Sequence, residues 1–163
     1  MIRLLVPDDA EELAALYAAN REFLAPFEPE RSDEFFTTAF QRRRIERIGH
    51  DLWRWAILDG SEIVGMIALA DVIREVLQAG NVGYFVSKEH NGRGLATSAV
   101  ADVVDFAFGE GGLHRLEAGT LVDNFASQRV LEKNGFDRFG VARKLLKING
   151  TWRDHILFER LAD

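Results

Sequence analysis

The chain has 163 residues, enough for one domain with a sizeable core, and 47% of them are hydrophobic and 28% charged, as in ordinary soluble globular proteins. It has no cysteine, which excludes disulfides, a cysteine nucleophile and cysteine-bound zinc. Its net charge of -6 argues against a nucleic-acid-binding surface, and the sequence has neither a signal peptide nor an apolar run near the roughly 20 residues of a membrane span. We therefore expect a single cytoplasmic domain over residues 1–163 that contacts neither membrane nor nucleic acid.

The first third of the chain predicts one strand and two helices. Residues 2–6 form a short apolar strand, and Pro7 with two aspartates after it begins a helix that runs to about Asn20. Ser32 can cap a second helix that ends near Ile48.

Two features of this region could bear on function. Residues 20–31 (NREFLAPFEPER) contain two of the three prolines, interleaved with apolar side chains. This segment is either a connector packed on the core or the wall of a substrate pocket. The arginine run at residues 42–44 is expected on a solvated helix face.

Strands dominate the rest of the chain. Residues 51–58 and 62–70 alternate around a turn at residues 59–60, and residues 82–86 are aromatic and β-branched. Two helices and three strands follow, at residues 95–108, 114–121, 124–134, 139–148 and 151–161, and the last two strands flank an Asn-Gly turn. This order predicts an α/β (α+β) three-layer sandwich, a mixed, mostly antiparallel sheet of about seven strands with helices on both faces.

The loop between the strand at 82–86 and the helix that starts at Leu95 has the composition of an anion site. The first turn of a helix carries free backbone N–H groups and the positive end of the helix dipole. Gly92 and Gly94 remove Cβ atoms from the approach to those amides, and Arg93 adds a positive charge.

Three phosphate-binding patterns and one structural alternative can be weighed for this loop. A P-loop needs Lys-Ser/Thr after its last glycine, and Leu95-Ala96 stands there instead. A Rossmann fingerprint needs a third glycine, where Thr97 stands. The pyrophosphate loop of acetyl-CoA-dependent acetyltransferases, Gln/Arg-x-x-Gly-x-Gly/Ala, is matched at Gly94 and Ala96, with Asn91 in the first position. A capping loop without a ligand is the remaining alternative.

The element order and several motifs together resemble the GNAT superfamily of N-acetyltransferases over nearly the whole chain. The motifs are Asn20, Phe23-Leu24, Pro26-Phe27-Glu28-Pro29, Ile73-Arg74 before Gly83-Tyr84, Asn91–Thr97, Asn124-Phe-Ala-Ser127, Leu131–Phe136, and Asn149-Gly150 with Asp154. Within the superfamily they resemble the RimJ/RimL group, nearer to RimJ, which acetylates N-terminal amines of ribosomal proteins.

The resemblance implies acetyl-CoA as the cosubstrate. The implied cofactor-binding residues are Phe85, Val86, Asn91, Gly92, Arg93, Gly94, Leu95, Ala96, Thr97 and Asn124. The loop amides and Arg93 would hold the pyrophosphate, Phe85–Ser87 would pair with the pantetheine arm, and a backbone N–H near Val86 would stabilise the oxyanion. Ser127 is implied as the catalytic proton donor to sulfur, although it could simply be the third residue of a helix that Asn124 caps.

Fewer residues can be assigned to binding of the acceptor amine. Phe27, Glu28 and Glu75 are candidate substrate-binding residues in loops that could reach the cleft. A glutamate that serves RimL-like proteins as a base has no counterpart, since residues 144–147 read KLLK, so the base is either a side chain or water. None of the four histidines has a metal-ligand spacing partner, and we expect no metal.

The acceptor amine itself is open. An N-terminal amine, with a pKa of about 7.7–8.0, is roughly 10% unprotonated at pH 7, whereas lysine is below about 0.1%, so a site without a strong base suits an N-terminal amine better. We expect acetyl transfer to the N-terminal alanine of a ribosomal protein, by a monomer or homodimer. A small amine such as an antibiotic or polyamine, or a CoA-binding module without catalysis, are the alternatives.

Overall fold

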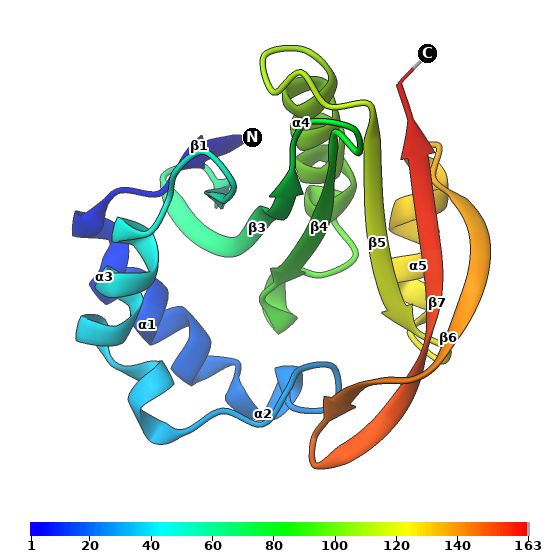
Figure 1. Cartoon of the computed structure of the whole chain (residues 1–163). Coiled ribbons are helices and arrows are strands. Elements are labelled where there is room, and N and C mark those ends of the chain that lie inside the picture. The colour runs from blue at the N-terminus through cyan, green and yellow to red at the C-terminus, as the bar shows by residue number, and fades with distance from the viewer. Residues whose placement is uncertain (163) are drawn as a thin grey trace.

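The computed structural model describes residues 1–162, whose strands form one seven-stranded sheet in the order β1-β2-β3-β4-β5-β7-β6 (Figure 1). The strands are β1 Ile2–Leu4, β2 Trp53–Asp59, β3 Glu62–Ile73, β4 Ala79–Val86, β5 Arg115–Leu121, β6 Asp137–Ile148 and β7 Thr151–Leu161. The helices are α1 Ala10–Ala19, α2 Arg21–Leu24, α3 Thr38–Glu46, α4 Leu95–Phe108 and α5 Phe125–Lys133. Among the described strands only β4 and β5 run parallel to each other, so the expected mixed, mostly antiparallel sheet is confirmed.

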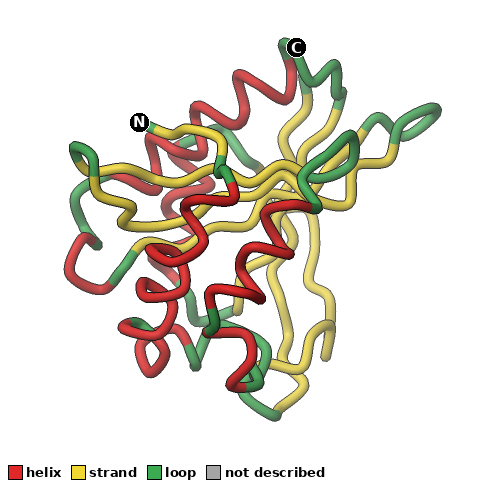
Figure 2. Tube along the Cα trace, turned by 90° about the vertical axis from the view of Figure 1, so that its left-hand side faces the viewer, coloured by secondary structure: helices red, strands yellow, loops and turns green. Residues whose placement is uncertain are grey.

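Helices cover both faces of the sheet, which confirms the three-layer arrangement (Figure 2). One core lies between the sheet and the α1–α3 segment and contains Leu13, Tyr17, Phe35, Ile45 and Ile63. The other lies between the sheet and the pair α4 and α5 and contains Val100, Val103, Leu116, Leu131 and Phe158. Alternate residues of each strand therefore face different helix layers, as the period of two requires. Within residues 1–162, no helix is long and apolar enough to cross a membrane.

The second predicted helix begins later than expected. Ser32 precedes a 3-10 turn at Asp33–Phe36, and α3 starts at Thr38. Thr37 is extended, with φ -91° and ψ 148°, and its hydroxyl accepts a hydrogen bond from the Phe40 amide at 3.3 Å. The true cap is thus Thr37, because the turn before it is needed to bury Phe35, which is 3% exposed.

Two glycines shape the ends of elements in the C-terminal half, and the second confirms the predicted Asn-Gly turn. Helix α5 ends in a Schellman motif, in which the Phe136 amide donates to Leu131 O at 3.1 Å and Gly135 has φ 71°. The β6–β7 turn has φ 45° at Asn149 and φ 77° at Gly150, the two positive values that a type I′ turn requires.

Strands β4 and β5 stay together for only part of their length. Ala79, Gly80 and Asn81 pair with Arg115, Leu116 and Glu117, and no pairs follow beyond them. The strands then diverge toward the lower part of the view in Figure 1. This divergence leaves one edge of β4 without a strand partner, and the candidate site lies along that edge.

Gly65 of β3 lies opposite Val86 of β4, with the backbone of β4 close to its Cα. A Cβ there would clash with the Phe85 carbonyl oxygen and lie 3.1 Å from Val86 Cα. We expect Gly65→Ala to lower the free energy of unfolding by about 2 kcal/mol, because backbone rather than a flexible side chain must move. Denaturant unfolding measures the change.

Gly83→Ala in the neighbouring strand is the matched control, since a Cβ there meets nothing within 4 Å. Its free energy of unfolding should stay within about 0.5 kcal/mol of the parent. Equal stabilities for the two variants would contradict the close approach of β3 and β4 at Gly65.

Candidate active site

The loop after β4 is folded back on the end of its own strand. The Asn91 side-chain amide donates to Val86 O at 3.1 Å and to Ser87 O at 2.9 Å. Gly92 and Gly94 have φ 76° and 78°, in the left-handed region where glycine has no steric penalty. A Cβ at either glycine would meet nothing within 4 Å, so the approach to this part of the loop is open. Asn91 thus fixes the loop, and the two glycines shape it.

Helix α4 presents its free amides at the end of this loop. The Ser98 amide makes the first intrahelical bond, to Gly94 O at 3.0 Å, so the amides of Leu95, Ala96 and Thr97 have no intrahelical acceptor. The helix is 14 residues long and has no acid in its first turn. Its positive end therefore faces solvent without a competing carboxylate.

Helix α5 forms the other wall of a recess of about 290 Å³ around these amides. Two exposed cations of α5, Arg129 and Lys133, line it. The Asn134 side chain joins the two helices, donating to Thr97 O at 3.1 Å and to Val130 O at 2.9 Å. Arg129 and Lys133 were not among the predicted site residues. They are four positions apart in the helix that Asn124 caps, and this spacing could have placed them on one helix face.

The structure pairs Arg93, which the sequence predicts to hold the pyrophosphate, with an acidic side chain. Its Nη1 lies 2.7 Å from Oδ2 of Asp59, the last residue of β2, and Arg93 does not line the recess. The Asp59 carboxylate attracts this guanidinium across the loop. The recess therefore owes its positive character to the α4 amides and to the α5 cations.

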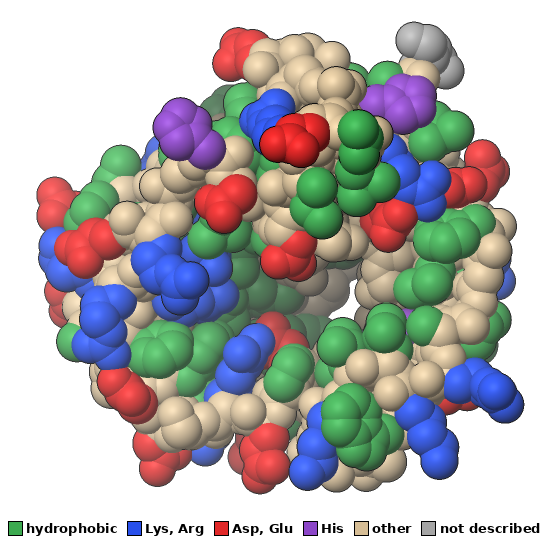
Figure 3. Space-filling view, in the orientation of Figure 1, with side chains coloured by type: hydrophobic (Ala, Val, Ile, Leu, Met, Phe, Trp, Pro, Cys, Tyr) green, Lys and Arg blue, Asp and Glu red, His purple; other side chains and the backbone are tan. Residues whose placement is uncertain are grey.

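A cleft of about 320 Å³ continues from the divergence of β4 and β5 (Figure 3). The Ser87 amide donates to Val64 O at 2.8 Å, so alternation in the antiparallel pair turns the polar backbone groups of Val86 and Tyr84 away from β3, toward the diverging edge. The backbone groups of Phe85 turn toward β3, and its ring packs 4.6 Å from the Tyr17 ring. The edge available to a ligand thus belongs to Tyr84 and Val86 rather than to Phe85.

Three polar side chains meet on the α5 side of the cleft. Tyr84 Oη lies 2.9 Å from Ser127 Oγ and donates to Ser127 O at 3.2 Å. Asn124 caps α5 by accepting the Ser127 amide at 3.2 Å. Burial raises the pKa of the Tyr84 phenol to about 12, so the phenol stays protonated at neutral pH and can donate. Tyr84 was missed as a functional residue because its partner is 43 positions away.

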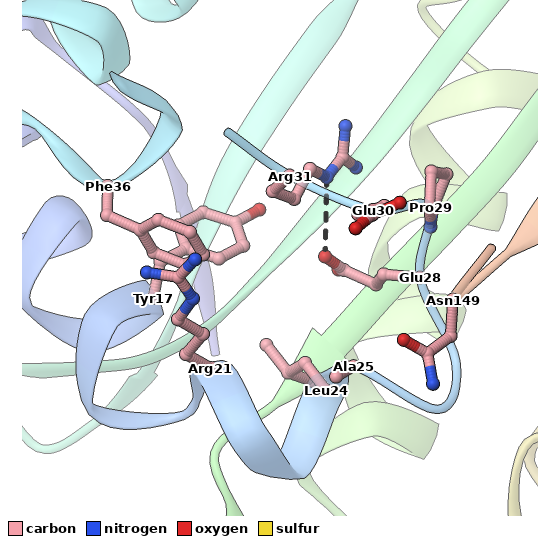
Figure 4. A pocket seen from close by; sticks show the side chains of 10 residues that line it. All are labelled: Tyr17, Arg21, Leu24, Ala25, Glu28, Pro29, Glu30, Arg31, Phe36 and Asn149. Atoms are coloured by element: carbon pink, nitrogen blue, oxygen red, sulfur yellow. Dashed lines mark ion pairs between the residues drawn. The ribbon is translucent and has the colours of Figure 1, made fainter. Parts of the chain in front are cut away.

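The opposite end of the cleft is built by the segment after α1 (Figure 4). Phe27, Glu28 and Arg31 line it, so the residue 20–31 segment is the wall of a pocket. Arg31 Nε lies 3.6 Å from Glu28 Oε2. Burial raises the pKa of the Glu28 carboxyl, and the charges of Arg31 and Arg44 oppose that rise.

Arg44 corrects the expectation of a fully solvated arginine face. Arg42 and Arg43 are exposed, but Arg44 is half-buried and lines the cleft. Its guanidinium lies 5.0 Å from the centroid of the Phe35 ring and 5.7 Å from that of Tyr17. The helical period places Arg44 toward the sheet when its two neighbours face outward.

Most predicted site residues come together, and Glu75 does not. Glu75 is exposed in the turn between β3 and β4, at the end of β4 opposite the glycine loop, and it lines neither the cleft nor the recess. His155 of β7 lines the cleft unpredicted, with 4% exposure. Its Nδ1 lies 3.1 Å from Arg153 O, which favours the tautomer that leaves Nε2 as an acceptor.

The model of the acetyltransferase (GNAT) domain family matches residues 1–137. The chain belongs to the GNAT acetyltransferases. It is 45% identical to a probable N-acetyltransferase, YjcK, of Bacillus subtilis over 94% of this chain and 89% of the relative. A solved ribosomal-protein-S5-alanine acetyltransferase from Vibrio fischeri superposes with a TM-score of 0.96 at 34% identity, covering 99% of this chain and 92% of the other. The RimJ of Mycobacterium smegmatis, solved in complex with CoA-disulfide, gives a TM-score of 0.93 at 27% identity, covering 99% and 81%.

The GNAT chain is therefore an acyltransferase whose acetyl donor is acetyl-CoA. The features of its site fit that group, since a recess with free helix amides and two cations suits phosphates, and an unpaired strand edge suits an amide-bearing arm. When bound, acetyl-CoA supplies the thioester that an amine attacks.

Thr120 of β5 lines the cleft between β4 and β5, and its hydroxyl lacks a hydrogen-bond partner among the described residues. The residue is 4% exposed, and its Oγ1 has no hydrogen-bond partner within residues 1–162. We expect Thr120→Val, which keeps the side-chain shape, to stabilise the fold by about 1 kcal/mol and raise Tm by about 2–4 °C. Thermal unfolding measures the shift.

Thr120→Ser is the control, because it keeps the hydroxyl and loses a buried methyl group. It should lower stability by about 1 kcal/mol. A lower Tm for Thr120→Val than for the parent would show that the hydroxyl has a partner and contradict the assignment.

Proposed function

We propose that this GNAT chain acetylates the N-terminal alanine amine of a protein, in the first instance a ribosomal protein. The observation that carries the proposal is a cleft that passes between β4 and β5, with the donor recess at one end and the Glu28 wall at the other. The name of the Vibrio fischeri protein, which is 34% identical, supports alanine as the acceptor residue.

On the donor side, backbone amides and cationic side chains together would bind acetyl-CoA. The amides of Leu95, Ala96 and Thr97 would hold the diphosphate, with Gly92 and Gly94 allowing its approach. Arg129 and Lys133 would add charge at the rim. The backbone groups of Tyr84 and the amide of Val86 would pair with the arm, since the Val86 carbonyl already accepts from Asn91, and Asn124 would orient the end of the arm.

On the acceptor side, Glu28 is the proposed proton acceptor. Its half-buried carboxylate has a raised pKa, which makes it a better base than an exposed glutamate. Deprotonation of an N-terminal amine does not require a strong base, because its pKa of about 7.7–8.0 leaves roughly 10% of it unprotonated at pH 7. A carboxylate of this strength therefore suits an N-terminal amine better than lysine.

For the leaving sulfur, the proposed proton donor is Ser127 in partnership with Tyr84. The phenol keeps its proton at neutral pH because burial raises its pKa to about 12, and its oxygen lies 2.9 Å from Ser127 Oγ. Ser127 Oγ would pass its proton to the thiolate as the C–S bond breaks, Tyr84 Oη would pass its own proton to Ser127 Oγ, and a proton from solvent would then restore the Tyr84 phenol. This adds Tyr84 to the residue expected from the sequence.

A small-molecule amine remains the second candidate acceptor, and the charge of the cleft argues against a polyamine. Glu28 is the only acid among the described residues that line the cleft, and it stands beside the cations Arg31 and Arg44. A chain of several ammonium groups would meet repulsion there.

Thiol release with an alanine-starting peptide, compared with spermidine, tests the proposed function. We expect turnover with the peptide and an acetyl group on its N-terminal amine, located by mass spectrometry. Faster turnover of spermidine, or acetylation of a lysine in place of the N-terminus, would contradict the proposal.

Ser127→Ala and Tyr84→Phe test the proton donor. Each should lower kcat about a hundredfold, the usual contribution of a positioned acid, while the Kd of acetyl-CoA stays within about twofold. Ser61→Ala, at an exposed serine in the β2–β3 turn, is the matched control and should keep the parent kcat. An unchanged kcat in Ser127→Ala would remove this residue from the mechanism.

A further inference from the structure

The acceptor end of the cleft holds an excess of positive charge next to the place where an amine must bind. Arg31 and Arg44 line it, opposed by Glu28 as the one acid among the described lining residues. An amine acceptor alone gives no reason for two guanidinium groups, since both repel an ammonium ion. The arrangement points to a second group on the acceptor.

Both guanidinium groups are held in place by one aromatic ring. Arg31 Cζ lies 4.5 Å and Arg44 Cζ 5.0 Å from the centroid of the Phe35 ring. Gln41, which is fully buried, donates to Phe35 O and accepts from Arg44 Nη1 at 2.9 Å. The ring and the glutamine thus fix the two cations before any ligand arrives.

Most hydrogen-bond donors of these two cations have no acceptor within residues 1–162, the bond from Arg44 Nη1 to Gln41 being the exception. A guanidinium carries five N–H donors. Arg31 Nε is buried and has no hydrogen-bond partner within residues 1–162, since Glu28 Oε2 at 3.6 Å is too distant for a hydrogen bond (Figure 4). A carboxylate is the acceptor whose planar geometry matches a guanidinium edge.

We propose that the acceptor carries a carboxylate close to its reacting amine, and that Arg31 and Arg44 bind this carboxylate while the amine faces Glu28. The inference rests on the proposed function and narrows it to N-termini with an acidic residue at the second or third position. One extended residue spans about 3.3–3.6 Å, so these positions keep the negative group within reach of cations that lie beside Glu28.

The test compares alanine-starting peptides of equal length with amidated C-termini, which differ only in Asp, Asn or Lys at the second or third position. A dipeptide with a free C-terminus supplies the same carboxylate from the main chain and forms a separate arm. We expect kcat/KM for the Asp peptide to exceed that for the Asn peptide by about tenfold or more, as for a hydrogen bond to a charged group, with Lys lowest.

Arg44→Gln should remove this preference by lowering kcat/KM for the Asp peptide more than for the Asn peptide, until the two values are equal. The matched control is Arg43→Gln, at an exposed neighbour on α3 that pairs with Glu34 outside the cleft, and it should keep the preference. Thermal unfolding of both variants separates a binding role from a purely structural one.

The outcomes are distinguishable. Equal kcat/KM for Asp and Asn peptides, with turnover intact, would overturn the acidic acceptor and leave N-terminal acetylation standing. Equal losses for all peptides in Arg44→Gln, with a lower Tm, would make Arg44 a structural residue and also overturn the inference. Absence of turnover with every peptide, alongside turnover of a small amine, would overturn the proposed function itself.

Discussion

The parallel pairing of β4 and β5 over only three residues each is the constraint on which the site depends. Parallel strands need a crossover helix, and here α4 begins nine residues after Val86, at Leu95, so its amide end lies beside the open edge of β4. The divergence then leaves the backbone groups of Tyr84 and Val86 without a strand partner. One topological feature therefore supplies both an anion-binding helix end and an edge for an extended ligand.

At this opening, the two faces of the sheet carry different groups of the site. Even-numbered residues of β4, such as Val82 and Tyr84, pack toward α4 and α5, and Phe85 packs toward α1 and α3. Groups suited to phosphates and to sulfur thus lie on one face. The half-buried carboxylate of Glu28 and the arginines of the α1–α3 side lie on the other face, and the opening between the strands joins the two sets of groups.

Much of the fold and part of the candidate site could be predicted from short sequence motifs. The glycine loop, the Asn124 cap and the Asn149-Gly150 turn follow from short sequences whose backbone needs are specific, and the hydrophobic periods gave the element order. What the sequence could not show depends on distant partners. Arg93 turns to Asp59 34 positions away, Tyr84 finds Ser127 43 positions away, and Arg44 stacks on Phe35 because α3 packs in one particular rotation. Glu75 was misplaced because loop length alone does not tell which end of a strand faces the cleft.

The most direct test of the account is a crystal structure of the protein with CoA. We predict the diphosphate within hydrogen-bonding distance of the Leu95–Thr97 amides, the arm along Val86 and Tyr84, and the sulfur beside Ser127. A diphosphate bound away from the start of α4, or a sulfur remote from the Tyr84–Ser127 pair, would contradict it.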